Sequence, residues 1–182
     1  MTSCASSILR RCCLALALCS LPVAAHDCTL SLSQAQIDLG SLRLGSLPIQ
    51  PGQSELSLGL RRLSLTIVCP RPTAMLLRFE GAAAGPQAYR LARGYFTVGL
   101  GNARLDGEPV SLAVEGRPEE HGADWLMAPG RTVRVLAQGL PAKGRFFSAQ
   151  VEVEPRLPLA MSRVGDETEI QGRGRFELVP GE

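Results

Sequence analysis

The sequence has no apolar run long enough to span a lipid bilayer, which takes about 18 residues or more. An apolar segment at residues 12–18 is too short to do so, and it directly follows two arginines. A short basic region, a short apolar segment and small residues ending at Ala25 are typical of a signal peptide. We therefore expect residues 1–25 to be removed during export, which leaves residues 26–182 as a single exported domain without a membrane span.

The chain also has little net charge and almost no lysine. Its 19 basic and 17 acidic residues give a formal net charge of +2, and Lys143 is the only lysine. Two of the arginines lie in the expected signal peptide, which has no acidic residue, so the exported chain carries no net charge. Binding to nucleic acid or to an anionic membrane surface requires a basic patch or stripe, whereas these charges are dispersed. We therefore expect neither partner.

Motifs of hydrolases and nucleotide-binding enzymes are absent. The sequence contains no Gly-x-Ser-x-Gly elbow, no phosphate-binding loop and no Cys–His nucleophile pair. Glu119 and Glu120 are adjacent carboxylates, but proline and glycine flank them, and such a loop is typical of a solvated charge cluster. We therefore expect no catalytic residues and no cofactor, and we predict that the protein is not an enzyme.

Histidine is scarce, and the two histidines leave one catalytic alternative open. His26 would be the first residue of the exported chain, and His121 is the only other histidine. Exported copper oxidases of polysaccharides resemble this chain in being β-sandwiches, and they bind copper through an N-terminal histidine and a second histidine. Imidazole is a good copper ligand, but the rest of those enzymes' pattern is not evident. We therefore expect no metal site.

Only two cysteines, Cys28 and Cys69, remain after the expected signal peptide is removed. Two cysteines in an exported chain most simply form a disulfide, because the compartments outside the cytoplasm are oxidising. Closing a loop of about 40 residues contributes about 4 kcal/mol in the chain-entropy model. Two free thiols are the alternative, and a metal site fits less well because the cysteines and histidines lack ligand spacing.

Apolar residues alternate with polar or small residues in segments throughout the exported chain. The apolar positions are Leu56, Leu58 and Leu60; Leu63, Leu65, Ile67 and Cys69; Met75, Leu77 and Phe79; Phe96, Val98 and Leu100; Val110, Leu112 and Val114; Val133 and Val135; Phe147, Ala149, Val151 and Val153; and Phe176 and Leu178. Such alternation is typical of strands with one buried face. Asp106-Gly107 and Pro129-Gly130 are turn signals between segments. The pattern predicts an all-β, antiparallel sandwich without an amphipathic helix.

The alternation changes parity at Arg61-Arg62. The apolar residues are even-numbered before this pair and odd-numbered after it. A continuous strand would turn its apolar side chains to the other face of the sheet at this point. The sequence therefore predicts a bulge or a strand break here.

Several short segments carry a resemblance to a known family. They are Cys28-Thr-Leu-Ser-Leu, Ile37-Asp-Leu-Gly40, Leu63-Ser-Leu-Thr-Ile-Val-Cys69, Gly94-Tyr-Phe-Thr-Val, Leu105-Asp-Gly107, Trp125, Ile170-Gln-Gly172 and Phe176-Glu-Leu178. Together they resemble bacterial fimbrial subunits, and most closely a pilin-like family of chaperone–usher systems that is catalogued as a domain of unknown function. The resemblance covers most of residues 26–182.

The resemblance implies an immunoglobulin-like sandwich that lacks its final strand. In that family a periplasmic chaperone fills the gap first, and the N-terminal extension of a neighbouring subunit fills it after passage through an outer-membrane usher. The C-terminal strand pairs with these partners, which places Phe176 and Leu178 at the partner strand. The protein is thereby expected in the periplasm and then in a fimbrium at the cell surface, where it could meet a host or surface receptor.

Two departures from the family refine this expectation. Only His26 and Asp27 would precede Cys28, whereas a polymerising pilin carries a donor strand there, so we expect a tip or adhesin-like component. The family's aromatic residue near the C-terminus is absent, which leaves a self-contained periplasmic binding or accessory module as the alternative. Trp125, the only tryptophan, could stack on a sugar in an adhesin, but a lone tryptophan in a β domain is more typical of the core.

Overall fold

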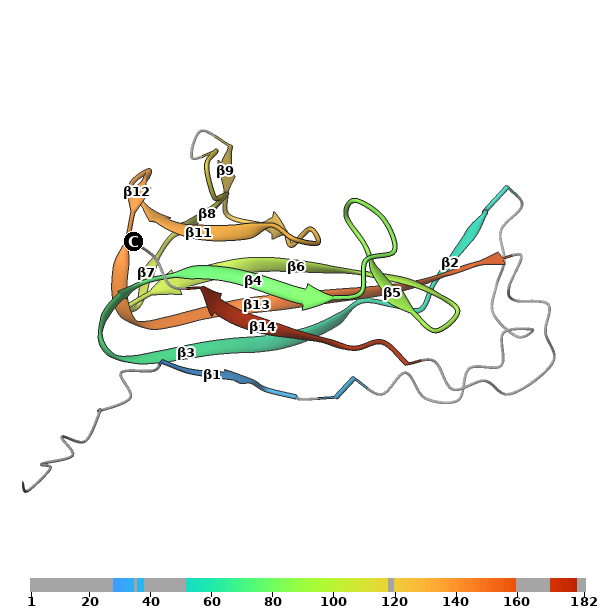
Figure 1. Ribbon diagram of the computed structural model, residues 1–182, viewed down its shortest axis with the longest axis horizontal. Coiled ribbons are helices and arrows are strands. Elements are labelled where there is room, and N and C mark those ends of the chain that lie inside the picture. Colours follow the sequence, from blue (N-terminus) through green and yellow to red (C-terminus); the bar gives the residue numbers. More distant parts are fainter. Residues whose placement is uncertain (1–27, 35, 38–51, 118–119, 160–170, 180–182) are drawn as a thin grey trace, which may run out of the picture.

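The structure, a computed structural model, describes residues 28–34, 36–37, 52–117, 120–159 and 171–179. Within these residues the chain forms two antiparallel β-sheets around a hydrophobic core, and it contains no α-helix (Figure 1). The predicted all-β, antiparallel architecture is therefore confirmed. No helix in the described part of the chain is long and apolar enough to cross a membrane.

The first sheet, which we call sheet A, is built around two long strands. In order across the sheet its strands are β1 (Thr29–Leu32), β3 (Arg61–Ala74), β13 (Lys143–Pro158), β6 (Gly94–Leu105) and β10 (Trp125–Leu126). The short strands β2 (Glu55–Ser57), β5 (Tyr89–Leu91) and β7 (Glu108–Pro109) extend it by pairing with β13, β6 and β6 respectively. Strand β13 thus lies in the middle, hydrogen-bonded to β3 on one side and to β6 on the other.

The second sheet, sheet B, has the C-terminal strand at one edge. Its order is β14 (Gly174–Val179), β4 (Leu76–Gly81), β11 (Thr132–Ala137), β8 (Ser111–Val114) and β9 (His121–Gly122), and β12 (Leu140–Pro141) pairs with β11. The chain passes from sheet A to sheet B at Met75, which lies between β3 and β4 and is fully buried. This crossing places the apolar faces of β3 and β4 toward the same core.

The core follows from the alternation in the sequence. Leu65 and Ile67 of β3, Phe147 and Val151 of β13, and Val98 of β6 all have no exposed surface. No polar or charged residue in the described part is buried. Burial of apolar surface on this scale is the main source of stability for such a domain.

An aromatic cluster occupies the core between the two sheets. Phe79 makes edge-to-face contacts with Tyr89, Phe96 and Phe176, at ring-centroid distances of 4.7, 6.1 and 5.0 Å. The Tyr89 hydroxyl donates a hydrogen bond to the carbonyl oxygen of Phe79 (3.2 Å), and burial raises the pKa of Tyr89 to about 12. The cluster therefore includes a residue of β14, so the C-terminal strand belongs to the core.

The predicted irregularity is present, but it lies at residues 58–60, directly before the expected position at Arg61-Arg62, where β3 begins. Strands β2 and β3 both pair with β13, and the chain between them, residues 58–60, holds one residue more than the opposing stretch of β13. Gly59 has a φ of +86°, which an L side chain rarely adopts. The extra residue keeps Leu56 and Leu63 on the buried face despite their different parity. Leu60, expected to face the core, is 41% exposed, so that part of the prediction was wrong.

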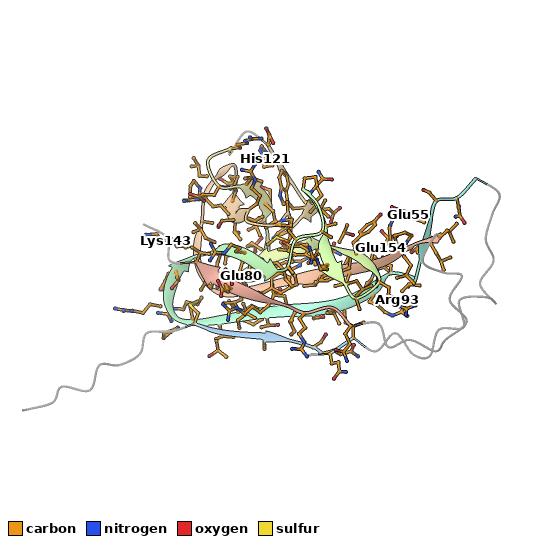
Figure 2. The ribbon with its side chains drawn as sticks, turned by 45° about the vertical axis from the view of Figure 1, so that its right-hand side comes forward. Glu55, Glu80, Arg93, His121, Lys143 and Glu154 are labelled. Carbon is orange, nitrogen blue, oxygen red and sulfur yellow. A yellow bond between two sulfur atoms is a disulfide. The ribbon has the colours of Figure 1, made fainter. Side chains whose placement is uncertain are left out.

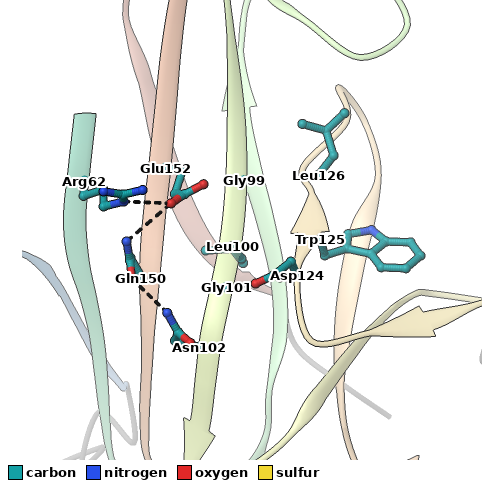
Figure 3. Close-up of a pocket in the computed structure, with 10 residues that line it drawn as sticks. All are labelled: Arg62, Gly99, Leu100, Gly101, Asn102, Asp124, Trp125, Leu126, Gln150 and Glu152. Atoms are coloured by element: carbon teal, nitrogen blue, oxygen red, sulfur yellow. Dashed lines mark hydrogen bonds and ion pairs between the residues drawn. The ribbon is translucent and has the colours of Figure 1, made fainter. Parts of the chain in front are cut away.

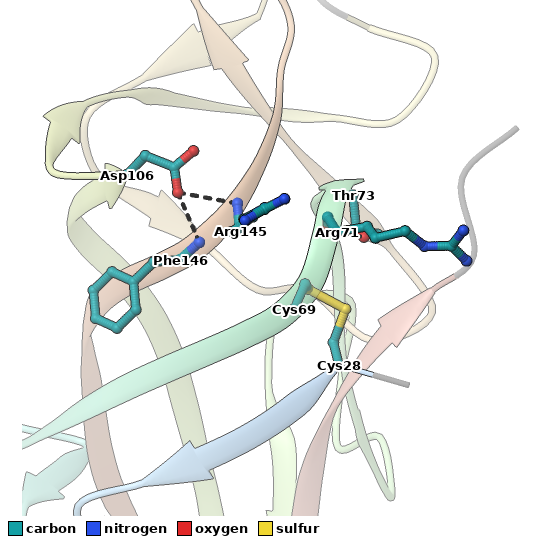
Figure 4. Close-up of a disulfide and its surroundings, with 7 residues drawn as sticks. All are labelled: Cys28, Cys69, Arg71, Thr73, Asp106, Arg145 and Phe146. Atoms are coloured by element: carbon teal, nitrogen blue, oxygen red, sulfur yellow. Dashed lines mark hydrogen bonds between the residues drawn. A yellow bond between two sulfur atoms is a disulfide. The ribbon is translucent and has the colours of Figure 1, made fainter. Parts of the chain in front are cut away.

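Two predicted turns also form. Asp106 and Gly107 both have positive φ values, 50° and 91°, and they connect β6 to β7 as a tight hairpin. The Asp106 carboxylate also accepts hydrogen bonds from the backbone N–H groups of Arg145 and Phe146 (3.0 and 2.8 Å), as Figure 4 shows. Pro129 and Gly130 form a turn before β11.

The predicted disulfide joins Cys28 to Cys69 with an S–S distance of 2.07 Å (Figure 4). Cys28 directly precedes β1, and Cys69 lies in β3, the neighbour of β1 in sheet A. The disulfide therefore fixes the start of an edge strand to a central part of the sheet. The pairing confirms the expectation from the cysteine count.

Candidate functional site

Strand β14 is an edge strand. Among the described residues it pairs with β4 alone, in a register that places Phe176 opposite Phe79 and Leu178 opposite Leu77. An edge strand presents a row of N–H and C=O groups on the side away from its neighbour, and these groups can bind a further strand. The backbone of β14 thus offers a template for strand addition.

A second edge strand lies beside it. Strand β1 is at the edge of sheet A, where β3 is its one sheet partner in the described part of the chain. Strands β1 and β14 are in contact with each other, and both run along the same side of the molecule (Figure 1). The two sheets therefore meet at this side with an edge strand each, which we call the β1–β14 edge pair.

The apolar side chains of the edge pair are incompletely covered. Leu30 and Leu32 of β1 and Leu178 of β14 pack against the core but are only half-buried. Phe176, two residues before Leu178 in β14, is only 8% exposed because Phe79 and the aromatic cluster cover it. Within the described residues, the edge pair thus combines a backbone edge without a paired strand and a row of partly exposed leucines.

The opposite face of β14 is charged. Two ion pairs join the neighbouring strands β4 and β14 on this face. Arg78 lies opposite Glu177 and Glu80 lies opposite Arg175, at N–O distances of 3.1 and 3.0 Å. The hydrogen bond from Arg78, aided by the charge of Arg175, lowers the pKa of the Glu177 carboxyl. Because one face of β14 is ionic and the other apolar, a shift of register by one residue would bury charge. The network therefore specifies which side chains face the core.

The sequence assigned Phe176 and Leu178 to a partner strand. The structure places both on the core-facing side of β14 at the edge of sheet B. It also brings β14 into contact with β1, a contact that alternation alone did not predict.

The other candidate residues do not gather into a site. His121 lies on β9, far from Glu80 and β14 (Figure 2), and His26 falls outside the described residues. Glu119 is also outside them, and Glu120 lies 3.5 Å from Arg117 in an exposed ion pair. No group of three histidine, cysteine, aspartate or glutamate residues is placed to hold a metal within the described ranges. Trp125 is half-buried and packs against the core, as expected.

A second feature was missed from the sequence. The outer face of sheet A contains a hollow of about 750 Å³ over β6 (Figure 3). It is lined by Arg62, Gly99, Leu100, Gly101, Asn102, Asp124, Trp125, Leu126, Gln150 and Glu152. Two glycines spaced by one residue in a strand pattern are the signal that could have indicated it, since they remove side chains from one face.

Comparison of the chain with protein-family models and with curated protein sequences finds no match. The edge pair and the hollow are therefore the two candidate sites among the described residues.

Proposed function

We propose that this protein is an exported fimbrial subunit of a chaperone–usher system, and that a strand from a partner completes its fold. The observation that carries the proposal is the β1–β14 edge pair, in which Leu178 is half-buried beside a strand edge that no other strand in the described part of the chain covers. Strand addition satisfies the main-chain groups of an edge, and alternate side chains of the added strand fill the apolar row.

The order of strands supports an immunoglobulin-like sandwich of the pilin type. Strands β1, β3, β13 and β6 are neighbours in sheet A, and β14 and β4 are neighbours in sheet B. In such a sandwich the final strand would lie on the free side of β14, next to β1. Its place is the position that a chaperone strand and then a neighbouring subunit would occupy.

The proposed cellular route is consistent with the covalent structure. The Cys28–Cys69 disulfide suits an oxidising compartment, and residues 1–25 have the pattern of a signal peptide. We propose passage through the periplasm with a chaperone, then through an outer-membrane usher to a fimbrium at the cell surface. We include a tip or adhesin-like position in this proposal.

The proposal is tested by supplying the strand in cis. A short glycine-rich turn and a strand of about six to eight residues, with leucine or valine at alternate positions, are added after Glu182. If these side chains contribute about 3 kcal/mol, the melting temperature of the purified protein should rise by about 10 °C. The same extension with aspartate at the apolar positions is the control and should give no rise.

Substitutions in β14 test whether the added strand binds at the edge pair. Leu178→Asp should cancel the gain from the extension, because it places a charge in the half-buried apolar row. Val179→Asp, on the other face of the same strand, should retain most of the gain. If the unextended protein is a cooperative monomer whose β14 amides are all protected from exchange, and the extension adds nothing, the fold is complete. A self-contained periplasmic binding or accessory module would then be the better interpretation.

A further inference from the structure

The hollow on sheet A arises from missing side chains on β6. One row of neighbouring residues crosses the sheet in the order Arg62, Glu152, Gly99 and Leu126, on β3, β13, β6 and β10. In the next row Gln150 of β13 lies opposite Gly101 of β6. Because both glycines face outward, the floor is backbone, while polar side chains rise on the β13 side and Asp124 and Leu126 on the other (Figure 3).

The two glycines differ in the space that a side chain would find at each position. A Cβ at Gly101 would lie 2.4 Å from the carboxylate oxygen Oδ1 of Asp124, so this exposed side chain would have to move to admit a larger residue. At Gly99 the nearest atoms to a Cβ would be 3.8 Å away, and its φ is not in the left-handed region. Packing therefore does not require Gly99 to lack a side chain, although a larger residue would fill the hollow. Glycine in a strand interior weakens the strand and often marks a bulge, a bend, or the close approach of a ligand or another backbone.

The polar side chains of the hollow are hydrogen-bonded to one another. The Asn102 amide donates to the side-chain oxygen of Gln150 (2.9 Å), the Gln150 amide donates to Glu152 (3.4 Å), and Arg62 donates to Glu152 (2.9 Å). Asn102 has a φ of 51° and lies at a bulge, where the register with β13 shifts by one residue. Bulges re-aim side chains, and left-handed non-glycine residues are concentrated at functional sites.

We propose that this hollow binds a neutral oligosaccharide through its hydroxyl groups. The amide, carboxylate and guanidinium groups that line the hollow can donate or accept hydrogen bonds with adjacent hydroxyls. Leu126 is 38% exposed on the rim and offers an apolar surface for the C–H groups of a sugar ring. The proposal does not depend on the partner strand, because the hollow lies on the outer face of sheet A rather than at β14.

The charges of the hollow disfavour other ligands. Glu152 and Asp124 are both acidic, and Arg62 already pairs with Glu152, so an anionic ligand would meet net repulsion. The absence of a three-ligand metal group among the described residues gives a cation no support here. Trp125 contributes to the lining, but its ring points away from the hollow (Figure 3), so stacking on this tryptophan is not part of the site.

The experiment uses an array of immobilised oligosaccharides from animal and bacterial surfaces, both neutral and anionic. The full exported protein is biotinylated and presented as a streptavidin tetramer, because several weak sites together give measurable avidity. We expect binding to a subset of neutral glycans. Gly99→Val should reduce that binding at least tenfold and leave the melting temperature unchanged or higher, because valine favours strands and has room here. Thr97→Val, two residues along β6 and outside the hollow, is the matched control and should bind normally.

Three outcomes would overturn the inference: no neutral glycan bound, binding confined to anionic glycans, or equal binding by wild type and Gly99→Val. The result is independent of the partner-strand test. Leu178→Asp should leave glycan binding intact in any preparation that stays folded, and Gly99→Val should leave the gain from the C-terminal extension intact.

Discussion

Strands β13 and β14 have the same alternation of apolar and polar residues but different neighbours. Strand β13 is paired on both sides, and its core-facing Phe147 and Val151 have no exposed surface. Strand β14 is paired on one side within the described part, and its Leu178 remains half-buried. The centre of sheet A is thus enclosed on both sides, whereas β14 in the described part leaves apolar surface and backbone groups that we propose a partner strand covers.

The largest difference is expected from removing one phenyl ring in each strand. Phe147→Ala should cost about 5 kcal/mol, because the ring is fully enclosed and leaves a cavity, and Phe176→Ala should cost about 3 kcal/mol, because the edge can relax. Urea unfolding followed by fluorescence and circular dichroism gives both values. Equal costs for the two variants would mean that β14 is as firmly enclosed as β13, and would weaken the case for a missing strand.

Removal of the disulfide is the next test of the comparison. The double variant Cys28→Ser and Cys69→Ser should lose about 4 kcal/mol, since closing this loop restricts the unfolded chain. The disulfide fixes β1 to β3, so amide exchange should increase first in β1. Reduced wild-type protein is the matched control and should behave in the same way. Uniform loss of protection over β1 and β13 alike would contradict a separate role for the edge.

Much of the fold could be predicted from the sequence because alternation reports which face of a strand is buried. It identified Phe147, Ala149 and Val151 as buried residues of β13 but missed Leu157, which is 1% exposed. It also indicated an irregularity close to the start of β3, where the extra residue keeps the apolar side chains on the buried face. It failed at Leu60, which lies inside that irregularity. The strands β9, β10 and β12 were missed because two residues are too few to show a period.

The candidate site was predictable only in part. Phe176 and Leu178 could be assigned to a core-facing strand, but alternation does not report how many neighbours a strand has. The edge position of β14 and its contact with β1 result from the order of strands, which depends on contacts between distant segments. The hollow depends in the same way on register, since Gly99 matters only because Glu152 and Leu126 lie on either side of it.

The smallest effect is expected from the charged face of β14, and it compares two carboxylates within sheet B. Arg78 lowers the pKa of Glu177 at the edge, and Arg134 lowers the pKa of Glu115 between β8 and β11. A carboxyl whose pKa is lower in the folded state stabilises the fold above its unfolded pKa, and this stabilisation is lost as the pH falls through the folded pKa. Glu177→Gln and Glu115→Gln should therefore each weaken the pH dependence of stability below about pH 4.5, the unfolded value. Amide hydrogen exchange, measured at pH 6 and in acid, distinguishes the two variants. Glu115→Gln should change the exchange of all core amides, because β11 is an interior strand. Glu177→Gln should change exchange in β14 and leave the centre of sheet A unaffected. Identical exchange patterns for the two variants would show that β14 opens only together with the whole domain, and the edge strand would then lose the independence that its proposed role in binding a partner requires.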